Sequence, residues 1–219
     1  MELRWNETYG TMELLELMEP TLLKAHFGNI DIYVFDQLLR GRIAPGMRVF
    51  DAGCGGGRNL VYLLRQGFDV CANDADPNAI AELRALASSL RPGGDFDFRV
   101  EPIERTSFPD DHADVVMSNA VLHFAGDEPQ FEAMLRQMWR VLKPGGVFFA
   151  RLASSIGIAS DLTALGGKRF RLPDGSTRFL VDAEAIESWT RRLGGSLIDP
   201  IKTTVVHNQR SMTTWVAKK

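Results

Sequence analysis

Residues 47–59, MRVFDAGCGGGRN, decide the fold: a short apolar run ends in a carboxylate and a cluster of glycines. The run predicts a buried strand over residues 47–51, and the glycines predict a tight loop after it. Residues 59–65 predict the helix that follows. Glycines let a backbone approach a ligand closely, and a helix N-terminus offers free N–H groups. This unit is therefore a place to bind a nucleotide-like ligand.

The spacing of the glycines argues against two common nucleotide sites. The dinucleotide fingerprint is Gly-x-Gly-x-x-Gly, and counting from Gly53 places Arg58 where the third glycine would fall. The phosphate loop that ends in Gly-Lys-Ser/Thr is absent as well. The pattern that remains over residues 51–57 is Asp-x-Gly-x-Gly-x-Gly.

A second carboxylate, Asp74, follows the next predicted strand, residues 68–73. An acid at the tip of the second strand can accept both hydroxyls of a ribose. The alternative is that Asp74 caps the helix predicted over residues 78–90, for which Asp76 and Asn78 are also candidates. A ribose acid and a glycine loop without a phosphate clamp fit an adenosine ligand that lacks pyrophosphate, such as S-adenosylmethionine (SAM).

Strands and helices alternate through the middle of the chain, with further strands predicted at 96–100, 114–118 and 147–151 and a strong amphipathic helix at 130–142. Two later β-rich runs, 196–206 and 211–217, read as an antiparallel pair. The alternation predicts an α/β fold: a doubly wound, Rossmann-like, mostly parallel seven-stranded sheet with an antiparallel last strand and helices on both faces.

A chain of 219 residues, 45% of them hydrophobic, is long enough for one sizeable core and short for two. We therefore expect a single domain. Its expected parts are an N-terminal helical cap at 1–44, a SAM-binding core at 45–155, an insert hairpin at 156–182, and a C-terminal helix and strand pair at 183–219.

The composition of the chain indicates which partners and which cellular location to expect. The formal net charge of −3 argues against a nucleic-acid partner, which usually requires a basic face. Cys54 and Cys71 form no metal-ligand spacing, so we expect reduced thiols and no metal. No signal peptide or apolar run of about 18 residues is visible. We expect a cytoplasmic protein without a membrane partner, and the oligomeric state stays open.

Five ordered features resemble those of class I SAM-dependent methyltransferases. They are residues 49–59, Asp74, residues 108–116 (FPDDHADVV), residues 118–124 (SNAVLHF) and residues 140–146 (RVLKPGG). Residues 57–59 and 67–70 are also similar to the small tellurite-resistance-type methyltransferases. The resemblance covers residues 45 to 155 and implies SAM as cofactor and S-adenosylhomocysteine (SAH) as product.

The resemblance also implies a set of cofactor-binding residues: Asp51, Gly53, Cys54, Gly55, Gly57, Arg58, Asp74, Ala75, Glu101, Pro102, Ile103, Asn119 and Ala120. Arg58 either meets the SAM carboxylate or is a solvated first-turn arginine. The family's usual adenine-reading aspartate corresponds to Pro102, so Glu101 or Ile103 must serve instead. His123 is either a general base for the acceptor or a packed, hydrogen-bonded histidine.

The methyl group of SAM is already activated, so catalysis mainly requires an electron-rich atom aligned behind it and water excluded. We expect a small-molecule acceptor held by the variable parts of the chain. Candidates are Trp5, Tyr9, His26, Phe27, Arg151, Arg169, Arg171, Arg178, His207 and Arg210. The main alternative is a non-catalytic SAM- or SAH-binding module. An oxidoreductase lacks its fingerprint here, and no basic extension supports a nucleic-acid substrate.

Overall fold

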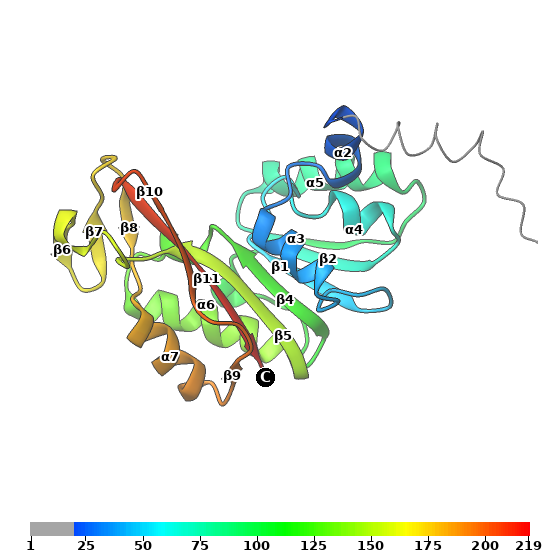
Figure 1. Ribbon diagram of the computed structural model, residues 1–219. Coiled ribbons are helices and arrows are strands. Elements are labelled where there is room, and N and C mark those ends of the chain that lie inside the picture. The colour runs from blue at the N-terminus through cyan, green and yellow to red at the C-terminus, as the bar shows by residue number, and fades with distance from the viewer. Residues whose placement is uncertain (1–19) are drawn as a thin grey trace, which may run out of the picture.

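The computed structural model describes residues 20–219 and contains one large sheet with helices on both of its faces (Figure 1). The strands lie in the order β10-β11-β5-β4-β1-β2-β3. Their bounds are β1 (Arg48–Ala52), β2 (Asp69–Asp74), β3 (Asp97–Val100), β4 (Ala113–Asn119), β5 (Leu142–Ala153), β10 (Lys202–Val206) and β11 (Arg210–Lys218).

The five strands from β3 to β5 run parallel, and β11 runs antiparallel to both of its neighbours. The predicted doubly wound sheet with an antiparallel last strand is thus confirmed. One boundary differs: the run predicted at 196–206 is split into β9 (Ser196–Leu197), which pairs with β11, and β10. Pro200 lies in the gap, where its missing N–H cannot join a ladder.

The central strands are buried on both faces, as parallel strands covered by helices must be. Side chains alternate between the faces with a period of two. Phe50, Val116 and Phe148 belong to the core cluster under α6 (Glu128–Val141) and α7 (Ala183–Arg192). The residues next to them, Val49, Val115 and Phe149, belong to the cluster on the opposite face.

That opposite face is covered by α3 (Ile32–Leu39), α4 (Val61–Arg65) and α5 (Pro77–Leu90). A further helix, α2 (Pro20–Phe27), packs its Phe27 ring on Tyr62 of α4 with centroids 5.1 Å apart. Residues 1–19, which include the first part of the predicted N-terminal helical cap and the candidates Trp5 and Tyr9, lie outside the described residues. No helix of the described segment 20–219 is long and apolar enough to cross a membrane.

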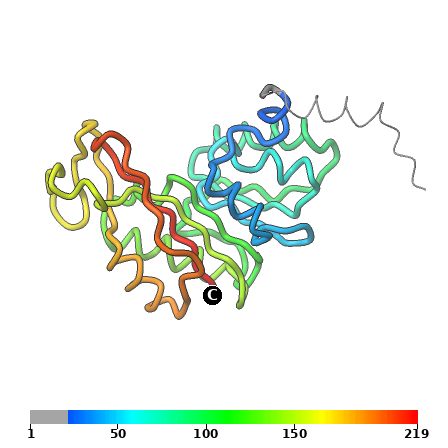
Figure 2. Tube along the Cα trace, viewed as in Figure 1, coloured from blue at the N-terminus to red at the C-terminus, as the bar shows by residue number. Residues whose placement is uncertain are grey.

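A second, small sheet lies in the predicted insert, residues 156–182, and contains the hairpin expected there. It consists of β6 (Thr163–Gly166), β7 (Arg169–Arg171) and β8 (Thr177–Phe179) in antiparallel order. The predicted pair is β7 and β8, and β6 is an addition that the sequence did not indicate. This sheet lies beside the turn between β10 and β11 (Figures 1 and 2).

Candidate active site

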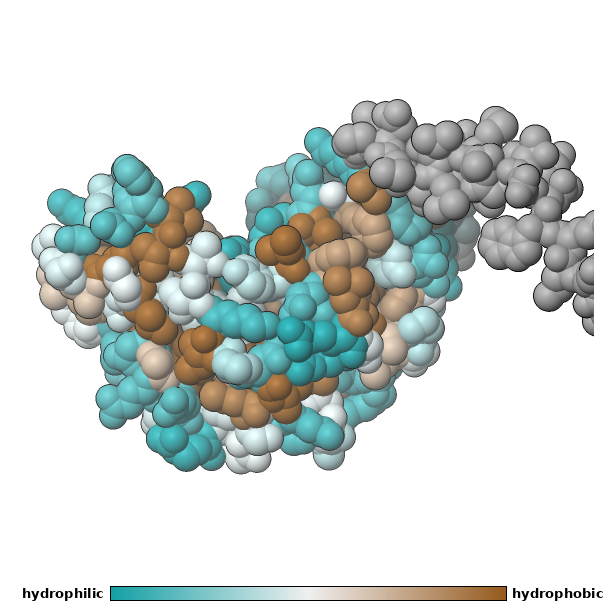
Figure 3. Space-filling model, in the orientation of Figure 1, coloured by the Kyte–Doolittle hydropathy of each residue, from teal (hydrophilic) through white to brown (hydrophobic). Residues whose placement is uncertain are grey.

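The carboxyl ends of β1, β2 and β4 meet at one edge of the sheet, where parallel α/β folds usually bind ligands. A cleft of about 770 Å³ opens there. Its lining includes Gly53, Cys54, Gly55 and Arg58 of the glycine loop, and also Asp74, Asn119, Ala120, Val121 and Phe124. The space-filling view is hollowed between the small sheet and the part of the molecule that contains α2 and α3 (Figure 3).

The glycine loop is held against β2 by backbone hydrogen bonds. The N–H groups of Gly53 and Cys54 both donate to the Asn73 carbonyl, at 2.9 and 3.0 Å. Gly53 has φ +76°, and a Cβ added there would lie 2.6 Å from a methyl carbon of Val121. Gly55 has φ +52°, and a Cβ there would meet nothing within 4 Å. Gly53 therefore permits close packing behind the loop, whereas Gly55 borders open space.

Asp74 is oriented by two backbone donors. One carboxylate oxygen accepts from Gly55 N at 2.9 Å and the other from Asp76 N at 3.0 Å. An ionised carboxylate has roughly four acceptor positions, so Asp74 keeps capacity for a ligand's hydroxyl groups. The N-cap of α5 is Asp76, which accepts from Asn78 N at 2.8 Å. The cap role considered for Asp74 thus falls to its neighbour.

Asp51 lies behind the loop and does not line the cleft. Its side chain is 2% exposed, and Oδ2 finds no hydrogen-bond partner within residues 20–219. Burial raises the pKa of Asp51 to about 7, although the nearby Arg58 guanidinium acts in the opposite direction. A buried carboxyl without a partner is costly unless a cation or donor approaches it.

Arg58 crosses the cleft to Asn119. Its Nη2 donates to Asn119 Oδ1 at 2.6 Å, while Asn119 Nδ2 is buried and unpartnered in the described part of the chain. Arg58 is exposed, and this hydrogen bond holds its guanidinium at the cleft. The next residue after Asn119, Ala120, has φ +64°, an uncommon conformation for a residue with a side chain.

A second cavity of about 220 Å³ continues from the cleft and shares Gly53, Asp74, Val121 and Phe124 with it. It is walled by predicted and unpredicted residues, which are Ala75, Pro102, Ile103, Glu104, Ala125, Gln130 and Met134. Its apolar walls suit a flat ring, and the Gln130 amide donates to Glu104 at 3.0 Å along one edge.

Glu101 is not brought to this cavity. Its carboxylate accepts from the hydroxyl of Thr106 at 2.6 Å and from the hydroxyl of Ser107 at 2.7 Å. Two residues were candidates for contacting the adenine. Ile103 lines the cavity, whereas the Glu101 side chain is held by hydrogen bonds from Thr106 and Ser107.

His123 is packed rather than poised over the cleft. It is 5% exposed, and its Nδ1 accepts from Ala153 N at 3.2 Å, so the ring hydrogen resides on Nε2. Burial, with a smaller effect of Arg178, lowers the pKa of His123 to about 4. A general base works best with a pKa near the operating pH. This environment favours the hydrogen-bonded interpretation over general-base catalysis.

A third cavity, of about 300 Å³, adjoins the cleft at Ala120, the residue that lines both. Arg151, Arg178 and Arg210 line it together with His123. Three candidates that lie far apart in the sequence are thus brought to one place. Arg169 and Arg171 are exposed on β7 and do not line it. His26 does not line it either and makes edge-to-face contacts with Phe27 and Tyr62.

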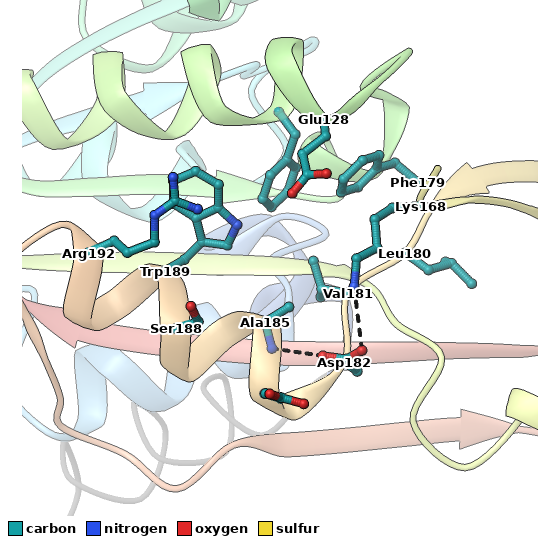
Figure 4. A pocket seen from close by; sticks show the side chains of 12 residues that line it. Glu128, Lys168, Phe179, Leu180, Val181, Asp182, Ala185, Ser188, Trp189 and Arg192 are labelled. Atoms are coloured by element: carbon teal, nitrogen blue, oxygen red, sulfur yellow. Dashed lines mark hydrogen bonds and ion pairs between the residues drawn. The ribbon is translucent and has the colours of Figure 1, made fainter. Parts of the chain in front are cut away.

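A separate cavity of about 290 Å³ lies between α6, α7 and β8 (Figure 4). Phe179, Trp189 and Arg192 border it, and Lys168 forms an ion pair with Asp182 at 3.7 Å. It shares no lining residue with the glycine-loop cleft.

Among residues 20–219, no group of three or more His, Cys, Asp or Glu side chains is arranged to hold a metal ion.

Several lining residues were missed by sequence reasoning. Val121 precedes the 3₁₀ turn Leu122–Phe124, which buries Leu122 and His123 and leaves its last residue, Phe124, at the cleft. The three-residue period of such a turn was the available signal. Gly28 and Asn29 reach the cleft from the segment between α2 and α3, and nothing local in the sequence marks them.

Comparisons with known proteins agree with this geometry. A family described as a methyltransferase domain matches residues 50–150. The ubiquinone biosynthesis O-methyltransferase of Chelativorans sp. (strain BNC1) is 29% identical over 208 residues, which cover 93% of this chain and 79% of that protein.

Solved structures show the same fold at low identity. A 1,6-didemethyltoxoflavin-N1-methyltransferase from Burkholderia thailandensis, crystallised with 1,6-didemethyltoxoflavin and SAH, has a TM-score of 0.66 and 17% identity. That match covers 100% of this chain and 92% of the other. TehB from Haemophilus influenzae has a TM-score of 0.65 and 20% identity, covering 87% of this chain and 62% of its own.

Motifs, fold and family match agree on one assignment. The segment that the family covers contains β1, the glycine loop, Asp74 and the strands up to β5. The ordered motifs of the sequence lie in the same segment, at the edge of the sheet where the cleft opens. The methyltransferase-domain match over residues 50–150, the relatives and the class I fold identify the chain as a SAM-dependent methyltransferase, an enzyme that uses SAM as its cofactor.

Proposed function

We propose that the protein methylates a small molecule, with SAM in the cleft of the glycine loop and the acceptor beyond Ala120. The observation that carries this proposal is the continuity of the cavities. The ring-sized cavity at Ile103 shares residues with the glycine-loop cleft, and the cleft meets the arginine-lined cavity at Ala120. A module that only binds SAM has no need of the third space.

Features of the cleft fit SAM part by part. Two backbone N–H groups hold the Asp74 carboxylate, and its remaining acceptor positions could bind the ribose hydroxyls. Ile103 and Pro102 would flank the adenine. At the other end, Arg58 suits the carboxylate of the methionine part. The unpartnered Asn119 Nδ2 would find an acceptor there. Asp51 would act through the loop on the positive charge of the ligand.

When bound, SAM supplies a methyl group on a positive sulfur: the sulfur–methyl bond breaks, its electron pair stays on sulfur, and the acceptor atom forms the new bond. The chain has to align the acceptor and exclude water. Val121 and Phe124 wall the space next to Ala120. His123 is neutral at pH 7 with its hydrogen on Nε2, and it would donate a hydrogen bond to the methyl acceptor. The proton that the methyl acceptor releases on methylation would pass to solvent.

We also propose where the enzyme acts and on what size of molecule. The names of the similar proteins specify small-molecule substrates, and the cavity beyond Ala120 is small. Both cysteines are buried and unpaired, which is usual in a reducing compartment. We therefore place the enzyme in the cytoplasm, acting on a dissolved small molecule.

The test is transfer of isotopically labelled methyl groups from SAM in a cell extract separated by molecular mass. We expect label in a low-mass compound other than SAM with the wild-type protein and its loss with Asp74→Asn. Label in the protein or nucleic-acid fraction would contradict a small-molecule acceptor. SAM binding without any transfer would favour the non-catalytic binding module.

A further inference from the structure

Three guanidinium groups line the cavity of about 300 Å³ beyond Ala120, which we call the arginine cavity. Arg151 comes from β5, Arg178 from β8 and Arg210 from β11. Asp174 is the single carboxylate in the same lining. The wall of the cavity therefore carries an excess of positive charge.

Arg151 is fixed in place before any ligand binds. Its Nη1 donates to Asp31 Oδ2 at 2.9 Å, and its guanidinium carbon lies 5.2 Å from the centre of the Tyr33 ring. Asp31 is itself held, because its other oxygen caps α3 by accepting from Tyr33 N. Arg151 Nε is buried and has no hydrogen-bond partner within the part of the chain that the structure describes.

The other two arginines form no ion pair with any carboxylate in the described part of the chain. Within residues 20–219, neither Arg178 nor Arg210 has a carboxylate oxygen within 4.0 Å. Asp174 Oδ1 accepts from the N–H and the hydroxyl of Ser176 at 2.9 and 2.6 Å, and the charge of this carboxylate acts on both arginines from more than 4.0 Å away. Arg178 also lies over the Phe124 ring at 4.8 Å, which connects the arginine cavity to the cofactor cleft.

The remaining walls are mostly apolar and are contributed by Ala153, Leu172, Val206 and Met212. A volume of about 300 Å³ is at the low end for small-molecule sites, so the space suits one ring-sized body. Guanidinium groups match a carboxylate in a two-pronged geometry and are weakly hydrated, which favours them for such contacts.

We propose that the methyl acceptor is a small carboxylic acid with a ring-sized apolar body, held with its carboxylate against Arg151, Arg178 and Arg210. Its methyl-accepting atom then lies at the Ala120 end of the cavity, next to the cofactor cleft. This inference rests on the proposed function, because it takes the arginine cavity to be the acceptor site.

The test uses benzoate as the probe and benzamide as its neutral counterpart of the same shape. Binding to the SAH-saturated protein is followed by ligand-observed NMR titration. We expect benzoate to bind at least tenfold more tightly than benzamide. The double variant Arg178→Gln/Arg210→Gln should lose at least tenfold in benzoate affinity. Arg169→Gln, which removes an exposed arginine of the neighbouring strand β7, should leave the benzoate affinity unchanged.

The affinity for SAH, measured in the same variants, shows that they are folded and separates the two proposals. If the wild-type protein fails to bind SAH, the proposed function fails, and benzoate binding without SAH still tests the cavity. If SAH binds but benzoate and benzamide bind equally, or benzoate does not bind, the carboxylate proposal alone is overturned. Tighter binding of phenyl phosphate than of benzoate would overturn the carboxylate proposal and indicate an acceptor that carries a phosphate group.

Discussion

At the scale of single residues, Asp74 shows how a ligand-binding side chain is prepared by its own backbone. The N–H groups of Gly55 and Asp76 hold its carboxylate, so the glycine loop and the start of α5 set its position together. Two of its acceptor positions are used in this way, and the others remain for a ribose. Asp76, two positions further along the chain, caps α5, which leaves Asp74 free of that task.

Substitution of Asp74 by Asn should weaken SAH binding by roughly tenfold to a hundredfold, because a hydrogen bond to a charged group contributes about 1.5–3 kcal/mol. Isothermal titration calorimetry measures the effect. The matched control is Asp76→Ala, which removes the cap of α5 and should cost about 1 kcal/mol of stability with little change in SAH affinity. Equal losses of affinity in the two variants would show that Asp74 acts only through the fold.

Asp51 has a pKa raised to about 7 by its burial, against an ordinary value of 3.8. Between these two values the folded state keeps a proton that the unfolded chain has released. The free energy of unfolding of the ligand-free protein therefore falls as pH rises through this window, and the penalty is complete above about 7. Only the ionised form attracts a cationic ligand.

We accordingly expect the affinity for SAH, whose amino group is cationic at neutral pH, to rise as pH rises from about 6 to about 8. The Asp51→Asn variant should bind more weakly and show a flatter pH profile. The same variant should be more stable than wild type at pH 8 when no ligand is present. Calorimetric titrations at several pH values and thermal unfolding provide both measurements. A wild-type profile as flat as that of the variant would rule out this role for Asp51.

At the scale of elements, the glycine loop depends on what packs against it. Gly53 approaches Val121 so closely that a Cβ would lie 2.6 Å from it, and its φ of +76° is strained for other residues. Gly56 has no such φ, and an added Cβ would meet the flexible end of Glu82. The two glycines stand three positions apart in one motif and yet have different structural demands.

Gly53→Ala should reduce SAH affinity by at least tenfold, since the loop must shift away from Val121 and from the Asn73 carbonyl. Gly56→Ala should keep affinity within about threefold of wild type, because a surface side chain can move aside. Both are measured by calorimetry, with circular dichroism to verify folding. A Gly56→Ala loss as large as that of Gly53→Ala would contradict the packing explanation.

The large sheet could be predicted from sequence because its strands are apolar runs bounded by turn residues, as at residues 47–59. The small sheet could be predicted only in part. All four residues of β6 are exposed, so they show no alternation to detect. The arginine cavity could not be predicted as a unit, since Arg151, Arg178 and Arg210 meet only through the pairing of β11 with β5 and the position of β8.

At the scale of the whole molecule, an ion pair joins the N-terminal and C-terminal parts of the described chain. Arg42 donates to both oxygens of Asp199, at 2.7 and 3.0 Å, and also to the carbonyl of Ile198. Asp199 is only 6% exposed at its side chain, and the hydrogen bonds from Arg42 lower its pKa. This contact joins the segment after α3 to the connection between β9 and β10.

Asp199→Ala should lower the free energy of unfolding by about 2 kcal/mol or more, because it leaves Arg42 partly buried without its partner. Arg40→Ala is the control, since Arg40 is more exposed and lies 3.7 Å from Asp199. Because the pKa of Asp199 is lowered, its stabilisation is present above the ordinary aspartate pKa and is lost as pH falls below it. Urea unfolding at pH 7 and pH 3 measures both effects; a wild-type advantage as large at pH 3 as at pH 7 would contradict this origin.

The most direct test of the central claim is a crystal structure of the protein soaked or grown with SAH. The ribose hydroxyls should lie on Asp74, the adenine beside Ile103, and the sulfur next to Ala120 with its open side toward the arginine cavity. Density for SAH in another cavity, or in this cleft with the sulfur facing away from Ala120, would contradict both the cofactor site and the acceptor site derived from it.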